Sequence, residues 1–311
     1  AVIPAIVALI IAALMMLMMS SCASERTSAP TGAPEGAAAH PDWQEKITIV
    51  QMPNENNPDA GQKHEGFRAG LEAALGIKVE ELEGSEYSVG IEAMKAGTLD
   101  VLLVSPMSYY QARRVANAEP LVTTATMGAD PYKTVFITQK DRDDINTIED
   151  MRGKSFAFVD PASSSGYMYP KAHLVTALEL DADRLEQPDY FFKTVTYSGK
   201  HDSSLIGVGM GDYDAAAVAY QVIGQLDAAG IINREDYKII GETEVIPNAC
   251  YVIRAGLPDD LKEAILEYYL AYDDSGYFEA FYQSPDIRFI RAYDSDYAVV
   301  DEMVRILNIE G

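Results

Sequence analysis

Three consecutive serines at positions 163–165 are the residues whose type and spacing most directly suggest chemistry in this chain. They follow an apolar run of strand type, residues 156–159, and they precede Gly166 and a segment with helical periodicity. Backbone N–H groups at a helix N-terminus lack partners inside the helix, and the helix dipole adds partial positive charge there. With serine hydroxyls they form a cradle for a tetrahedral oxyanion. A serine that only caps a helix gives the same local pattern, so the rest of the chain must decide between the two interpretations.

The segments that must position these serines alternate between strand and helix patterns. Short apolar runs predict strands, and apolar residues spaced three or four apart predict helices. Helices of about ten residues between strands indicate parallel βαβ units. The predicted strands are 47–51, 77–82, 99–104, 121–125, 134–139, 154–159, 190–196, 213–219, 237–241 and, in the opposite sense, 249–254. The predicted helices are 61–75, 87–96, 106–116, 145–151, 166–179, 201–210, 221–229, 258–272 and 297–307.

The strand–helix pattern restarts once along the chain, which predicts an α/β protein with two lobes. Each lobe is expected to hold a mostly parallel sheet flanked by helices. One lobe comprises residues 45–127 plus 248–311, and the other comprises residues 128–247. We expect a ligand between the lobes at the carboxyl ends of the strands, where open α/β sheets bind ligands. The serine run follows one of these strand ends.

The chain begins with an uncharged and almost wholly apolar segment, residues 1–21. This segment ends in two serines, and Cys22 follows it. This pattern predicts a secretory signal. It resembles a bacterial lipoprotein signal, with Met rather than the usual Leu at the first lipobox position, Met19. The resemblance implies cleavage before Cys22 and lipidation of its thiol. An uncleaved anchor helix is the alternative, and both place the remaining chain outside the cytoplasm.

Composition narrows the partners that the folded part can have. Residues 22–44 are chiefly small, polar or Pro, which predicts a flexible tether. The net charge of −24 argues against nucleic acid and against an anionic membrane surface as partners. Cys250 is the one cysteine after Cys22, and the four histidines show no metal-ligand spacing, so we expect no metal and no cofactor. An anion site in so acidic a chain must rely on local donors.

Several segments, taken in order and spacing, resemble the phosphate, phosphite and phosphonate substrate-binding proteins of ABC transporters. The resemblance covers nearly all of residues 45–311. No single motif is decisive, but their order and spacing together are specific. The segments are YSVGIEAMKAGTLDV (87–101), SPMSY (105–109), FVDPASSSGY (158–167), SGKHD (198–202), DAAAV (214–218) and IPN (246–248).

This resemblance implies a two-lobed Venus-flytrap fold, the type II periplasmic-binding-protein fold, that closes on a phosphorus oxyanion. The hinge crossings are expected near 126–131 and 244–249. On the resemblance, His201 donates from the start of a helix, and two tyrosines add phenolic donors; a His201 that only caps its helix is the alternative. Neutral donors on rigid element ends lose little side-chain entropy on binding. The ligand-binding residues that the resemblance implies are Ser163, Ser164, Ser165, His201, Tyr87 and Tyr132.

Two positions depart from the pattern that many relatives keep. Ala249 stands where relatives often continue with Asp, in a region that recognises the ammonium of aminoalkylphosphonates. Ala219 likewise replaces a frequent Asp. Both departures favour a ligand without a cationic group, such as phosphite, phosphate or methylphosphonate.

The function expected from these observations is that of an extracytoplasmic receptor. It would capture a phosphorus oxyanion and deliver it to an ABC permease with its ATPase, as a monomer anchored by lipid on the outer face of the cytoplasmic membrane. A sensor that binds the same anion without transport is one alternative. A hydrolase is the other, but it would need a nucleophile beside a base or a metal cage. Asp202 is the one acidic neighbour of His201 in sequence and would not share its helix face, so we expect no enzyme.

Overall fold

The computed structural model describes residues 40–50, 60–82, 86–125, 131–282 and 284–309. The predicted leader, Cys22 with its lipid and most of the predicted tether lie outside the described residues. At the start of the described part, the Gln44 side chain donates to the Asp100 carboxylate at 2.9 Å. Among the helices of the described ranges, none has both the length and the apolar character needed to cross a membrane.

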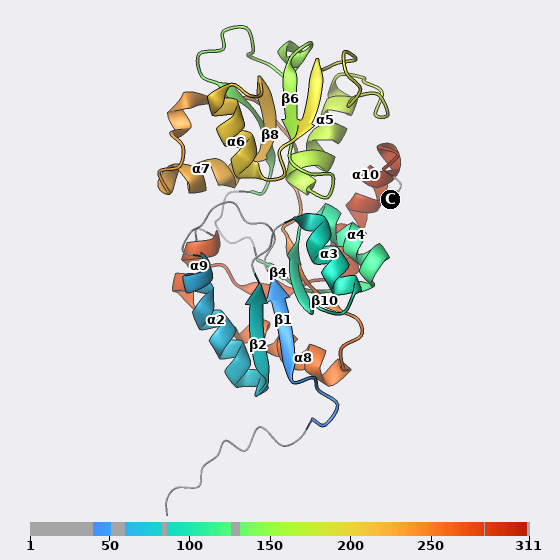
Figure 1. The fold of residues 1–311 in the computed structure, drawn as a ribbon, viewed down its shortest axis with the longest axis vertical. Coiled ribbons are helices and arrows are strands. Elements are labelled where there is room, and N and C mark those ends of the chain that lie inside the picture. Colours follow the sequence, from blue (N-terminus) through green and yellow to red (C-terminus); the bar gives the residue numbers. More distant parts are fainter. Residues whose placement is uncertain (1–39, 51–59, 83–85, 126–130, 283, 310–311) are drawn as a thin grey trace, which may run out of the picture. The chain divides into compact units, whose positions relative to one another are not determined.

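The strands form two separate β-sheets, and helices surround them (Figure 1). The strands are β1 (Lys46–Val50), β2 (Lys78–Leu82), β3 (Val101–Val104), β4 (Ala118–Thr124), β5 (Thr134–Gln139), β6 (Ser155–Phe158), β7 (Thr194–Tyr197), β8 (Ala215–Ala219), β9 (Tyr237–Glu242), β10 (Cys250–Arg254) and β11 (Phe289–Arg291). The first sheet has the order β11-β4-β10-β3-β1-β2, and the second has the order β7-β6-β8-β5-β9. We call the halves built around them the first and second lobes.

Both sheets are mixed, because a strand of opposite sense is inserted among strands that share a direction, and in the first sheet the edge strand β11 also runs antiparallel to its neighbour β4. In the first sheet, β1, β2 and β3 pair in parallel, and β10 pairs antiparallel with both β3 and β4. In the second sheet, β6 pairs in parallel with β7 and β8, whereas β5 is antiparallel to β8 and β9. Each inserted strand is the first one after the chain crosses between sheets. The opposite sense predicted for 249–254 is therefore confirmed.

Helices pack around the two sheets, and most start at the carboxyl end of a strand. They are α2 (Ala60–Leu75), α3 (Tyr87–Lys95), α4 (Pro106–Ala116), α5 (Tyr169–Ala177), α6 (His201–Met210), α7 (Tyr220–Ala228), α8 (Asp259–Ala271), α9 (Ser275–Tyr282) and α10 (Ala298–Ile306). Three short 3₁₀ turns are η1 (Glu149–Met151), η3 (Arg234–Asp236) and η4 (Asp294–Tyr297), and η2 (Ser164–Met168) is a π-helical turn.

Most predicted elements are present with similar bounds, and three differences are informative. The helix predicted at 145–151 is only the 3₁₀ turn η1, because the Asp150 carboxylate accepts the N–H groups of Asn146 and Thr147 and so closes a turn before it. The sequence did not predict α9 or β11. Both are too short to show a clear period in a sequence window.

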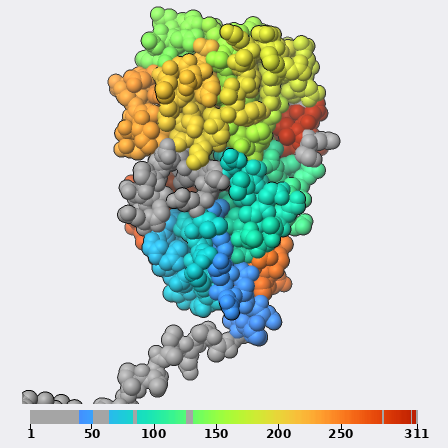
Figure 2. Space-filling view, in the orientation of Figure 1, coloured from blue at the N-terminus to red at the C-terminus, as the bar shows by residue number. Residues whose placement is uncertain are grey.

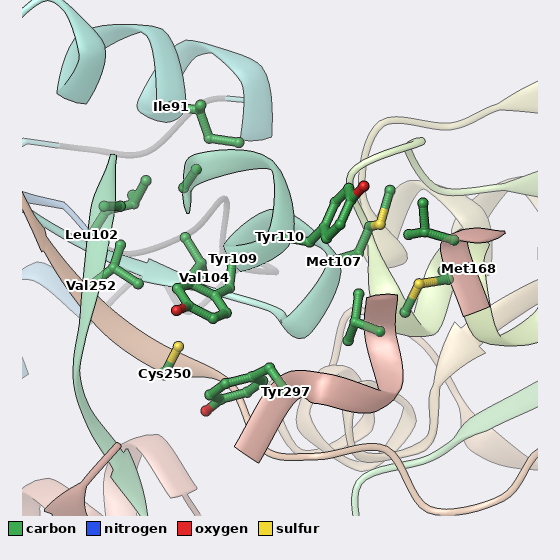
Figure 3. Close-up of a cluster of buried hydrophobic side chains, with 14 of the residues drawn as sticks. Ile91, Leu102, Val104, Met107, Tyr109, Tyr110, Met168, Cys250, Val252 and Tyr297 are labelled. Atoms are coloured by element: carbon green, nitrogen blue, oxygen red, sulfur yellow. The ribbon is translucent and has the colours of Figure 1, made fainter. Parts of the chain in front are cut away.

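An apolar seam joins the lobes beside the crossings of the chain. Met107 of α4, in the first lobe, belongs to the same buried cluster as Met168 of η2, in the second lobe (Figure 3). Val304 and Leu307, from the C-terminal segment, complete this cluster. Figure 2 shows that segment, in red, packed against residues of both lobes. The seam keeps the start of α4 next to the loop that carries the serines.

Candidate functional site

The serine run follows the carboxyl end of the central strand β6, as predicted, and its last two residues begin η2. All three serine side chains are buried. Gly166 makes this turn possible, because a Cβ atom at that position would lie 2.3 Å from Cβ of Val159. The chain therefore passes directly over the end of β6, and only glycine fits there.

Ser163 is the N-cap residue of η2. Its Oγ accepts a hydrogen bond from the N–H of Gly166 at 3.0 Å. This is the capping role that the sequence left open as the alternative to anion binding. The cap occupies a lone pair of the hydroxyl and leaves its proton to be donated elsewhere.

Ser165 is the residue at which the predicted donors meet. The Tyr132 hydroxyl donates to Ser165 Oγ at 2.8 Å, and His201 Nε2 lies 3.2 Å from the same oxygen. The Ser165 carbonyl accepts the Thr134 hydroxyl at 2.7 Å. Three of the six predicted residues are thus in direct contact, although they are far apart in sequence.

His201 is held as a neutral hydrogen-bond donor. Its Nδ1 accepts the backbone N–H of Ala219 at 3.1 Å, so the ring proton of the neutral form must sit on Nε2. Nε2–H therefore donates to Ser165. The ring is buried, and burial lowers the pKa of His201 to about 3. The start of α6 also disfavours a positive charge, because the helix dipole is positive at that end.

These contacts determine what Ser165 can offer a ligand. Its oxygen already accepts hydrogen bonds from Tyr132 and His201. Its own proton must then be donated in a third direction. A hydroxyl that receives two hydrogen bonds is polarised into a stronger donor. Ser165 is therefore arranged to give a hydrogen bond to an acceptor.

Ser164 faces a different group. Its Oγ accepts the N–H of Met107 at 2.7 Å and lies 3.1 Å from the hydroxyl oxygen of Ser105. Both partners belong to the start of α4, where Ser105 is the N-cap residue. In the sequence, residues 105–109 contributed only to the resemblance and to the predicted start of a helix at 106.

Tyr87 is the first residue of α3 and is buried. It packs with Val159 and Ala162, which flank the serine loop on the second lobe. The structure thus brings Tyr87 against residues that flank the serine run, whereas Tyr132 contacts Ser165 directly.

The side chains around the serines are neutral. Within the described ranges, the three serine side chains bond to hydroxyl, imidazole and backbone groups and to no Lys or Arg. The nearest acidic residue in sequence, Asp160, accepts the N–H of Ala162 at 2.7 Å, and burial raises its pKa. This matches the local, uncharged donor set expected of an anion site in an acidic protein.

His201 and Cys250 could act as a base and a nucleophile, but neither has the surroundings that these roles require. Nδ1 of His201 is bonded to a backbone N–H instead of a carboxylate, so no acid orients the ring as a general base. Cys250 is fully buried, and burial raises the pKa of its thiol to about 12. A search of the described residues finds no group of three or more His, Cys, Asp or Glu side chains that could hold a metal.

Two lobes with mixed sheets, and a buried donor cluster at the end of a strand, define a periplasmic-type solute-binding protein. Over residues 49–297 the chain matches the family described as ABC transporter, phosphonate, periplasmic substrate-binding protein. It belongs to this family of substrate-binding proteins. The predicted family and fold class are therefore confirmed.

Similar proteins agree with this assignment. The chain is 33% identical over 180 residues to the phosphate-import protein PhnD of Mycolicibacterium smegmatis; the match covers 55% of this chain and 54%, about half, of that relative. Its fold resembles a binding component of an ABC phosphonate transporter from Pseudomonas aeruginosa, with TM-score 0.74, 20% identity and coverage of 85% and 87% of the two chains. It also resembles PhnD1 of Prochlorococcus marinus in complex with methylphosphonate, with TM-score 0.72, 19% identity and coverage of 85% and 98%.

The close approach at Gly166 predicts the effect of a single added methyl group. Gly166→Ala should lower the free energy of unfolding by about 1–3 kcal/mol or more, because Val159 on the strand cannot move away easily. Gly224→Ala, in α7, is the control, since nothing lies within 4 Å of its added Cβ. It should be neutral or stabilise by up to about 1 kcal/mol. Urea denaturation of both variants measures this, and equal stabilities would contradict the tight turn.

Proposed function

We propose that this protein captures a phosphorus oxyanion at the serine loop and delivers it to an ABC permease with its ATPase. The observation that carries the proposal is the convergence of Tyr132 and His201 on Ser165. It leaves a polarised serine hydroxyl, in the π-helical turn η2, as a donor toward a ligand. Family membership supports the transport role.

Two of the remaining predicted residues, Ser163 and Tyr87, fit around such an anion. The hydroxyl proton of Ser163, the N-cap residue of η2, would add a donor from the second lobe. Tyr87 would add a phenolic donor from the first lobe when the lobes close. Hydrogen bonds to an ionised acceptor are about twice as strong as neutral ones, so several neutral donors are enough to hold a dianion.

The closing movement would involve the lobes proposed from the sequence, residues 45–127 plus 248–311 and residues 128–247. A ligand that contacts both lobes only in the closed form shifts the population toward that form, which a permease can recognise. We further propose that the receptor is a monomer held on the outer face of the cytoplasmic membrane by lipid on Cys22.

The ligand that we propose carries no ammonium group. Position 219 contributes only its backbone N–H to the site, and it uses that group to hold His201. At position 249, also Ala, the backbone carbonyl accepts a hydrogen bond from the Thr123 hydroxyl. Phosphate, phosphite and methylphosphonate are therefore the candidates, and the names of the relatives include phosphate and methylphosphonate.

Removing the central donors should weaken binding without unfolding the protein. Ser165→Ala should raise the dissociation constant for the bound anion by about 10- to 100-fold, because a hydrogen bond to a charged group contributes about 1.5–3 kcal/mol. His201→Gln should also raise it, because the variant disturbs the donor that polarises the Ser165 hydroxyl. Isothermal titration calorimetry measures the effect. Ser203→Ala, an exposed serine on α6, is the matched control and should bind like the wild type. Unchanged affinity in both site variants would refute this placement of the site.

A ligand panel tests the proposed chemical class. Phosphate, phosphite and methylphosphonate should bind more tightly than 2-aminoethylphosphonate, because no carboxylate is supplied at positions 219 and 249 to pair with the amine. Calorimetry with the four compounds under one set of conditions gives the order. Tightest binding of the amine would contradict the proposal.

A further inference from the structure

A continuous chain of hydrogen bonds connects the start of α4 with the serine loop. The Met107 N–H donates to Ser164 Oγ at 2.7 Å, and the Ser164 hydroxyl donates to Ser105 Oγ at 3.1 Å. Ser105 Oγ lies 2.9 Å from Ser108 Oγ, and the Ser108 hydroxyl donates to the Ala162 carbonyl at 2.7 Å. The chain starts on the first lobe, crosses to the second, returns, and ends on the second.

The proton count gives this chain one direction. Each hydroxyl has one proton to donate. The proton of Ser108 goes to the Ala162 carbonyl, so Ser105 is the donor in its contact with Ser108 and the acceptor in its contact with Ser164. Ser105 Oγ also lies 3.3 Å from the Ala162 carbonyl, which is a longer contact. Hydrogen bonds that run in one direction strengthen one another.

This chain of hydrogen bonds can form only when the two lobes meet. Ser105 and Ser108 follow β3 in the first sheet, whereas Ala162 and Ser164 follow β6 in the second. All four residues are buried. If the lobes part, each of these groups must exchange its partner for water. The network therefore favours the state in which α4 lies against the loop.

We propose that Ser105 and Ser108 form a latch that determines how tightly this receptor holds its ligand without touching it. They are positioning residues, which fix the serine loop through Ser164 and the Ala162 carbonyl. The hydroxyl of Ser164, which the sequence assigned to the anion, belongs to this latch. The proposal rests on the function proposed above, because its consequence is a longer lifetime of the closed, ligand-bound form.

A direct contact with the anion is the competing role for these hydroxyls, and ligand selectivity separates the two. A latch is the same for every ligand that the closed form holds. Removing the latch should weaken the binding of phosphate and the binding of methylphosphonate by the same factor. A hydroxyl that touches the anion would instead change the ratio of the two affinities, because the two ligands differ in one substituent on phosphorus.

The test compares wild type, Ser108→Ala and Ser164→Ala, with Ser275→Ala at the exposed start of α9 as control. Alanine is a good helix former, so Ser108→Ala should leave α4 intact. Stopped-flow binding with phosphate and methylphosphonate should show dissociation of both ligands faster by about tenfold, equivalent to about 1.4 kcal/mol, with association unchanged. The double variant, which combines Ser108→Ala and Ser164→Ala, should lose less binding free energy than the two single variants lose in sum, because both residues act in one network.

Small-angle scattering adds a measurement that a merely structural role would not change. Under subsaturating ligand, Ser108→Ala should have a larger radius of gyration than the wild type, while its thermal midpoint without ligand stays close to that of the control. Equal dissociation rates and equal radii would overturn the latch, and so would a changed selectivity ratio. If the wild type bound neither anion, the proposed function would fail. The radii of wild type and Ser108→Ala without ligand would then test the latch separately, and equal radii would reject it.

Discussion

The hydrogen bond from the Ala219 N–H to Nδ1 of His201 is the constraint on which the site depends. It fixes the proton of the imidazole on Nε2, and burial keeps the ring neutral, with a pKa of about 3. Nε2–H and the Tyr132 hydroxyl then both donate to Ser165, whose own proton must be donated in a third direction. A carboxylate in place of this backbone donor would favour a charged ring and give the same residues a different chemistry.

The fold supplies this constraint through its topology. β8 ends at Ala219, α6 starts at His201, and the serine loop follows β6, the strand beside β8. Because β6 and β8 are parallel neighbours, their carboxyl ends lie at one edge of the second sheet. Helices that start at this edge direct unpaired N–H groups and partial positive charge toward it. On the proposed function, a chain with a net charge of −24 would therefore hold an anion without a cation beside the serines.

Much of this arrangement could be predicted from the sequence, and the exceptions have physical reasons. The helices at 106–116 and 201–210 and the strand at 134–139 have the predicted bounds, because clear periodicity and end signals mark them. The resemblance grouped Ser165, His201 and Tyr132, and the structure brings these three side chains into contact; their role in binding a ligand stays a prediction. The partner of Ser164 could not be predicted, since Met107 lies 57 positions away and meets it only when two lobes pack. The tautomer of His201 depends on a backbone group, which side-chain patterns do not reveal.

Nitrogen-15 NMR of the histidine rings tests the central claim most directly, because it reports both the charge and the tautomer of His201. The spectra would be recorded from about pH 5 to 8, with and without methylphosphonate, and His201→Gln would assign the signal; an unperturbed histidine titrates near 6.5 in this range. The structure predicts a neutral ring with its proton on Nε2 throughout, in both states. A ring that becomes cationic in this range, or that carries its proton on Nδ1, would contradict the account.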